Sequence, residues 1–442
     1  MANITKRGNS YKITVSNGYD ITGKQIRESA TFTPDPSMTA KQQEKALNKF
    51  VIEFEESVKN GKYLDGEKMT VKDFAERWMK EYVNVNLAPR TQEKYSWTLE
   101  KVILPQIGHL KLSKVTPLHL TSLYNRLTED GARMDGKEGG LSPNTIQKYH
   151  VMLSGMFKAA TQWMILDSNP CQRAVVPKVK QKQEIKFFTD EQALIFLQAL
   201  DEEYPRTIKG HTRIDDTGKP YQVSDYIEKQ SIELQFKVYF YVALYSGARR
   251  GEIVSLTWQD IDFSNRLIDI NKTASSVKGR VIVKQPKTLT SNRKIVLPDI
   301  VLKLLRQHRK EQIEYRFSLG DKWIGEGDYV FTQWNGKMMD PSTPYQKFKR
   351  VLELHNKKIL ADDALSAKQK EENLLPDISL HGLRHTSATL LLSEKMDPVT
   401  VANRLGHAKA STTLDIYAHA LEKNDKAASD TLDHLLTRKQ AR

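Results

Sequence analysis

The first forty residues alternate between polar and apolar side chains. Period-two patterning runs through residues 10–16 and again through residues 27–33, which indicates strands. Asn17-Gly18 lies between the two runs, and this dipeptide is typical of a tight hairpin turn. The pattern predicts a β-hairpin or small meander over residues 1–38.

The pattern then changes to a helical period. Thr39-Ala-Lys-Gln42 predicts the start of a helix, because a threonine and a glutamine three residues later can cap the first turn. Apolar residues follow on one face of that helix: Leu47, Phe50, Val51, Phe54 and Val58. Residues 61–66 contain two glycines and are expected to be a linker.

Residues 70–169 carry helical patterns only. Thr70, Thr116 and Ser142 each stand where a helix N-cap is expected, and the last two precede a proline that suits the first helical position. A long apolar stripe follows Ser142: Ile146, His150, Leu153, Phe157 and Ala160. Because His150 lies on this stripe, we expect it to be a core histidine with a hydrogen bond.

The remainder of the chain mixes both periods. Thr189 predicts a helix start, residues 204–230 are polar and predict an insertion loop, and residues 231–246 predict a helix that ends near Gly247. Strands are expected at residues 266–270, 281–283 and 293–297. Helices are expected at residues 298–315, 341–356, 382–395, 398–405 and 411–419.

These patterns predict a multidomain protein, mainly α with small β-sheets. A chain of 442 residues is too long for one ordinary core. We expect a small sheet plus helix (1–62), an all-α domain (68–172), a basic linker (173–188), a mixed α+β domain (189–420) and a C-terminal tail (421–442).

Charge and cysteine content narrow the class of function. The net charge of +14 implies an anionic partner, nucleic acid before membrane. No apolar run approaches the length of a membrane span, and no signal peptide opens the sequence. Cys171 is the only cysteine, which excludes intramolecular disulfides and cysteine-cluster zinc sites and fits the cytosol.

The chemistry lies in the last half of the chain. Ser246-Gly-Ala-Arg249 is followed by Glu252, three residues beyond the arginine. His381-Gly-Leu-Arg384-His comes next, and Leu405-Gly-His407 precedes Tyr417. A phenol is a weak nucleophile at neutral pH, and it needs cationic donors around the phosphorus that it attacks. The set therefore indicates cleavage of a phosphodiester with the DNA end held on tyrosine.

These three blocks resemble the tyrosine recombinase (phage integrase) family, in the family's order and at its spacing. The upstream layout is similar to that of integrases from temperate phages and integrative conjugative elements of Gram-positive bacteria. The resemblance implies an arm-type DNA-binding domain, a core-binding (SAM-like) helical domain and a catalytic domain. It also implies a site-specific recombinase of the bacterial cytoplasm that forms a 3′-phosphotyrosine and integrates, and excises, a mobile element.

The resemblance assigns roles by position. Arg249 and Arg384 would clamp one phosphate, Tyr417 would attack it, and His381 would exchange a proton with the tyrosine. His407 would donate to a non-bridging oxygen, and Glu252 would fix a neighbouring side chain. Lys287 would protonate the leaving 5′ oxygen, with Lys284 and Lys294 as alternatives. His385 is expected to be structural. The scheme needs no cofactor and no metal, because arginine and lysine supply the positive charge.

The expected partners follow from the same resemblance. They are double-stranded DNA at core and arm sites, three further copies in a homotetramer, and an excisionase or a host DNA-bending protein. Eight polar or basic side chains are candidates for DNA contact. They are Arg90, Thr91, Lys94, Asn144, Lys148, Lys178, Lys180 and Lys182.

Two other functions stay open from the residues alone. A type IB topoisomerase shares the arginine, lysine, histidine and tyrosine chemistry, and a non-catalytic DNA-binding regulator shares the scaffold.

The C-terminal tail also allows two interpretations. Leu421, Ala428, Leu432 and Leu435 give a short apolar stripe, which packs either on its own domain or on a neighbouring subunit.

Overall fold

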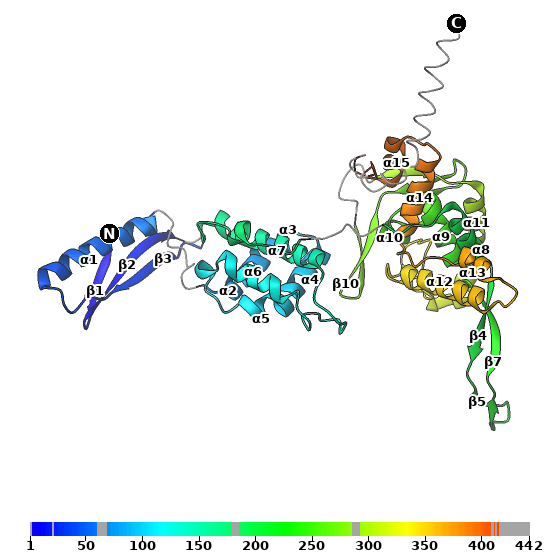
Figure 1. Ribbon diagram of the computed structural model, residues 1–442, viewed down its shortest axis with the longest axis horizontal. Coiled ribbons are helices and arrows are strands. Elements are labelled where there is room, and N and C mark those ends of the chain that lie inside the picture. Colours follow the sequence, from blue (N-terminus) through cyan, green and yellow to red (C-terminus); the bar gives the residue numbers. More distant parts are fainter. Residues whose placement is uncertain are drawn as a thin grey trace, which may run out of the picture. The chain divides into compact units, whose positions relative to one another are not determined.

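The computed structural model describes residues 2–19, 22–59, 69–178, 185–284, 292–407, 411 and 413–414. The chain divides into two compact units, Met1–Lys182 and Gln183–Arg442. Both are built mainly from helices with small antiparallel sheets, as Figure 1 shows. The predicted fold class, mainly α with small β-sheets, is confirmed.

The N-terminal segment is a three-stranded meander with one helix. Its strands are β1 (Asn3–Arg7), β2 (Ser10–Tyr19) and β3 (Gln25–Phe32), in the order β1-β2-β3, followed by α1 (Ala40–Lys59). Thr39 and Gln42 form the expected contacts at the start of α1. The core of this segment joins the sheet to the predicted helical stripe through Ile13, Val15, Phe54 and Val58.

The predicted position of the hairpin turn was wrong. Asn17-Gly18 lies inside β2, where the pairing with β3 shifts register between Ser16 and Tyr19. Gly18 has a φ of +81°, so the dipeptide forms a bulge in the strand. The first turn instead follows Arg7, with Gly8 at a φ of +58°.

The second segment of this unit is helical, as predicted. Its α-helices are α2 (Val71–Trp78), α3 (Asn84–Asn86), α4 (Pro89–Thr98), α5 (Leu104–Ile107), α6 (Pro117–Arg126) and α7 (Pro143–Gln162). Short π and 3₁₀ turns join them: η1 (Met79–Val83), η2 (Leu99–Ile103), η3 (Leu112–Lys114) and η4 (Pro170–Arg173). Thr70, Thr116 and Ser142 cap helices as expected. His150 is half-buried, and its Nδ1 lies 3.1 Å from the Tyr124 hydroxyl.

The second unit begins with α8 (Asp190–Ala199), which Thr189 caps as predicted. The prediction of a loop at residues 204–230 was wrong, because this segment forms a β-ribbon. The strands β4 (Glu203–Ile208) and β7 (Tyr226–Ser231) pair with each other, and β5 (His211–Ile214) pairs with β6 (Pro220–Val223) beyond them. Figure 1 shows β5 at the end of this ribbon. Its side chains are mostly exposed, so the polar composition that suggested a loop also fits a solvated ribbon.

The rest of this unit surrounds an apolar central helix, α9 (Leu234–Ser246). Two sheets accompany it, β12-β9-β8 and β10-β11. The strands are β8 (Ile261–Asp262), β9 (Leu267–Ile270), β10 (Thr273–Val277), β11 (Arg280–Lys284) and β12 (Arg293–Val296). The helices are α10 (Arg250–Val254), α11 (Asp299–Leu319), α12 (Thr343–Ala361), α13 (Ala367–Asn373), α14 (Gly382–Ser393) and α15 (Pro398–Leu405), with 3₁₀ turns η5 (Trp258–Asp260) and η7 (Gly320–Lys322).

Most of these elements match the sequence pattern. The strands β8 and β10 and the helix α13 were not predicted, because they are short and carry little periodicity. Within the described residues, no helix is long and apolar enough to cross a membrane.

Candidate active site

Arg249 stands between two helices. α9 ends at Gly247, whose φ of +62° is the left-handed conformation that glycine adopts without strain. Arg249 is then the N-cap residue of α10. This turn confirms the helix end predicted near Gly247, and the Arg249 side chain beyond it is 40% exposed.

Glu252 holds Arg249 through both its backbone and its side chain. The Arg249 backbone N–H donates to Glu252 Oε2 at 2.8 Å, and Arg249 Nη1 donates to Oε1 at 2.8 Å. Glu252 itself is almost fully buried. Although burial raises the pKa of a carboxyl group, the hydrogen bond and charge of Arg293 and the hydrogen bonds from Arg249 outweigh it and lower the pKa of Glu252.

Arg384 joins the ends of two helices. It is 2% exposed, and its Nη1 donates to Gly247 O at 2.8 Å and to Leu405 O at 2.7 Å. Arg249 Nη2 donates to Gly406 O at 3.1 Å. Gly406 ends α15 with a φ of +68°, so two arginines from distant sequence blocks bind carbonyls at two glycine turns.

The histidines lie around the same arginines. His381 is the N-cap residue of α14, and its ring lies 4.9 Å from that of His385 at 86°. Desolvation, followed by the charges of Arg384 and Arg249, lowers the pKa of His381 to about 4. Desolvation and the neighbouring His381 and Arg384 lower the pKa of His385 to about 4 as well. His385, expected to be structural, therefore packs directly against a candidate catalytic ring.

His407 follows the glycine that ends α15. Its Nδ1 lies 2.8 Å from Thr413 Oγ1. Desolvation and the charges of Arg384 and Arg249 lower the pKa of His407 to about 4. At neutral pH, and without DNA, the three histidine rings are therefore uncharged. Tyr417 lies outside the described residues.

The candidate general acids come from β11, from β12 and from the sequence between these strands. Lys287 is outside the described residues, and Lys284 is the last residue of β11, partly buried. Lys294 is exposed on β12, and its charge contributes to the lowered pKa of Asp262. Since successive side chains of a strand point to opposite faces, Lys294 faces away from the site that Arg293 contacts. Lys284 and Lys294 both stay open as alternatives to Lys287.

The DNA-contact candidates fall into two groups. Arg90, Thr91 and Lys94 lie on the first turns of α4, and Asn144 and Lys148 lie on the first turns of α7. All but the partly buried Thr91 are exposed, as is Lys178. Lys180 and Lys182 lie outside the described residues.

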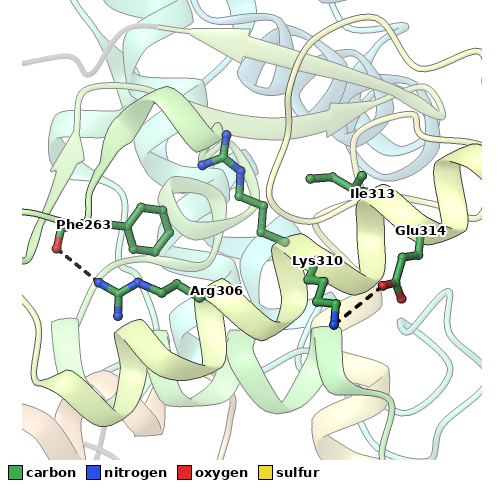
Figure 2. Close-up of a pocket in the computed structure, with 6 residues that line it drawn as sticks. Phe263, Arg306, Lys310, Ile313 and Glu314 are labelled. Carbon is green, nitrogen blue, oxygen red and sulfur yellow. Dashed lines mark hydrogen bonds and ion pairs between the residues drawn. The ribbon is translucent and has the colours of Figure 1, made fainter.

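One surface pocket lies away from these residues. Figure 2 shows it beside α11, lined by Phe263, Arg306, Arg309, Lys310, Ile313 and Glu314. No candidate catalytic residue lines it. Across the described ranges, no three His, Cys, Asp or Glu side chains are grouped so as to hold a metal ion.

Comparison with known proteins agrees with this geometry. Residues 220–424, which hold all three blocks of candidate residues, match the phage integrase family. Residues 70–128 match the N-terminal SAM-like domain of phage integrases. The chain belongs to the tyrosine recombinase (phage integrase) family. It is therefore a site-specific recombinase, an enzyme that breaks and rejoins DNA strands.

Relatives with similar length support the assignment. A tyrosine recombinase XerC-like protein of Caldanaerobacter subterraneus subsp. tengcongensis is 26% identical over 98% of both chains. The ICEBs1 integrase of Bacillus subtilis is 26% identical over 80% of both chains. Among solved structures, the Tn1549 transposon integrase in complex with a circular intermediate DNA has a TM-score of 0.60 and 20% identity. That match covers 83% of this recombinase and all of the other chain, and it shows a shared fold.

Proposed function

We propose that this recombinase integrates and excises a mobile element by way of a 3′-phosphotyrosine on Tyr417. The observation that carries the proposal is the meeting of Arg249, Arg384, His381 and His407 at the Gly247 and Gly406 turns. These groups are far apart in the sequence and contribute donors of the kind that a phosphodiester needs.

The chemical step follows from the state of each group. The Tyr417 oxygen attacks phosphorus, a P–O bond forms, and the bond to the 5′ oxygen breaks. The exposed edge of the Arg249 guanidinium binds a non-bridging oxygen, and the buried Arg384 supplies a second positive charge. Neutral His381 accepts the phenol proton, and Lys287 donates a proton to the leaving oxygen.

His407 is the donor to the other non-bridging oxygen. When the Thr413 hydroxyl donates to Nδ1, the single proton of the neutral ring lies on Nε2. That N–H is then available to the phosphate. Reversal of the step by a partner strand's 5′ hydroxyl completes exchange, since the phosphotyrosine ester conserves the energy of the broken bond.

The upstream segments supply the binding of specific DNA. The exposed polar residues at the starts of α4 and α7 would contact the core site, with Lys178, Lys180 and Lys182 along the connecting backbone. The β1–β3 sheet would bind arm sites, because the major groove admits a two-stranded β-ribbon. A homotetramer would hold two duplexes, and an excisionase or a DNA-bending protein would set direction.

The decisive experiment is covalent trapping on nicked attachment-site DNA. Wild-type protein should form a protease-sensitive adduct, and Tyr417→Phe should bind the same DNA with no adduct. An adduct that forms at the normal rate in Tyr417→Phe would remove Tyr417 from the mechanism. Relaxation of supercoiled DNA without site preference would indicate a topoisomerase instead, and the absence of any wild-type adduct would indicate a DNA-binding regulator.

A further inference from the structure

Arg293 is a buried guanidinium that the catalytic scheme above does not use. It is the first residue of β12, and its side chain is 7% exposed. Residues 285–292, which include Lys287, come immediately before it. A buried arginine in this place requires partners that compensate for its lost hydration.

Those partners belong to two different parts of the active site. Arg293 Nη2 donates to Glu252 Oε2 at 2.8 Å. The same oxygen accepts from the backbone N–H of Arg249, and the other Glu252 oxygen accepts from the Arg249 side chain. Arg293 Nε donates to Arg404 O at 2.7 Å, in the last turn of α15 and just before His407.

Gly406 shows how closely Arg293 approaches that turn. A Cβ added at Gly406 would lie 2.8 Å from Arg293 Nη1, and Gly406 O is the acceptor for Arg249 Nη2. One guanidinium thus contacts the carboxylate that orients Arg249 and the turn that carries His407. Arg293 is also the first residue of β12, the strand that follows Lys287 in the sequence.

We infer that Arg293 is a positioning residue for the recombination site. Its planar guanidinium binds Glu252 and the turn before His407 together, and so holds the Arg249–Glu252 pair in place relative to His407. Lysine cannot replace it fully, because an ammonium group lacks the fixed fork that reaches a carboxylate and a carbonyl together. The inference rests on the proposed function, since it assigns Arg293 to the geometry of that same site.

The test is a double-mutant cycle on single-turnover cleavage of a nicked duplex that the wild-type protein cleaves. In metal sites, removing the partner that orients a ligand side chain typically costs about 10- to 100-fold in activity, and we expect a loss of similar size here. Arg293→Gln should slow cleavage by about that factor and leave DNA affinity within about threefold. Arg293→Lys should recover part of the rate. Arg316→Gln, which removes an exposed arginine on α11, is the matched control and should cleave like the wild type.

Coupling separates a positioning role from a general loss of fold. If Arg293 acts through Glu252, the double variant Glu252→Gln/Arg293→Gln should be no slower than the slower single variant. Rate losses that multiply, or a wild-type rate in Arg293→Gln, would overturn the inference. Should Arg293→Gln fail to give a cooperative urea transition, the same cycle is run with Arg293→Lys and judged by the same criteria. Failure of the wild-type protein to cleave would instead reject the proposed function.

Discussion

His407 Nδ1 and Thr413 Oγ1 lie 2.8 Å apart, and Thr413 is fully buried. This contact joins the turn at the end of α15 to the segment that leads to Tyr417. A buried hydroxyl hydrogen-bonded to one ring nitrogen fixes the orientation of the ring and therefore the direction of the other nitrogen. Sequence analysis did not single out Thr413, since a threonine in a helical segment carries no catalytic pattern.

Thr413→Val should therefore slow strand cleavage by about tenfold, in the range of lost outer-shell partners. Valine keeps the shape and removes only the hydroxyl. Thr413→Ser is the control, because it retains the hydroxyl and should retain most of the rate. Single-turnover adduct formation is the measurement, and equal rates for the valine and serine variants would show that the contact does not orient His407.

The two arginines should differ in what their removal costs. Arg249→Ala should lower cleavage by about a hundredfold, as for one preorganised donor, and should cost less stability than Arg384→Ala, because the Arg249 side chain is 40% exposed and Arg293 still pairs with Glu252. Arg384→Ala should destabilise the fold by about 2–4 kcal/mol, because it removes the donor that Arg384 supplies to the buried carbonyls of Gly247 and Leu405. Urea denaturation alongside cleavage kinetics checks both, and equal stability of the two variants contradicts the prediction.

Any side chain at Gly247 should destabilise the fold. Gly247→Ala introduces a Cβ 2.5 Å from Leu405 Cδ2 at a φ of +62°. Gly279→Ala is the matched control, with a φ of +73° and nothing within 4 Å of its Cβ. Both pay the backbone strain of about 1 kcal/mol, and Gly247→Ala should lose a further 1–3 kcal/mol, roughly, from overpacking. Similar urea midpoints for the two variants would show that the packing between the turns that end α9 and α15 can relax with little loss of stability.

The histidine cluster predicts a pH dependence of stability. The pKa of His381, His385 and His407 is about 4 in the folded protein, against an ordinary 6.5. Between these values the unfolded chain binds more protons, so stability rises with pH through the window and is lost as pH falls from 6.5 towards 4. His385→Gln should reduce the proton uptake on unfolding near pH 5 by about one. Urea midpoints measured from pH 4 to 7 give the slope of stability against pH. An unchanged slope in the variant would reject a lowered pKa for His385.

Lys148 provides a test of the core-binding surface. Lys148→Gln should weaken binding to core-site DNA and reduce the slope of log affinity against log salt by about one, as expected for one lost phosphate contact. Lys158→Gln on the same helix is the control, because Lys158 lies on a different face of α7 and is also exposed. Salt titrations of binding give both slopes. Identical slopes for the two variants would place the DNA elsewhere.

The sequence by itself determined those features that depend only on interactions between residues close together in the chain. Caps at Thr70, Thr116, Ser142 and Thr189 were predictable because a side-chain oxygen and a backbone N–H two or three residues later are enough to form them. The family was predictable for a related reason, since each block keeps its reactive residues within a few positions. The same local reasoning misplaced the Asn17-Gly18 turn, because strand pairing with β3 decided where β2 ended.

Only the tertiary structure decided which groups meet. Arg384 reaches Gly247 O across 137 positions of sequence, and Arg293 reaches Arg404 O across 111. No periodicity or motif encodes such contacts, because they depend on how α9, α15 and β12 pack together. The low pKa values of the histidines have the same origin, since burial and neighbouring arginines, both set by packing, control them. The residues of the site were visible in the sequence, and the buried network that holds them was not.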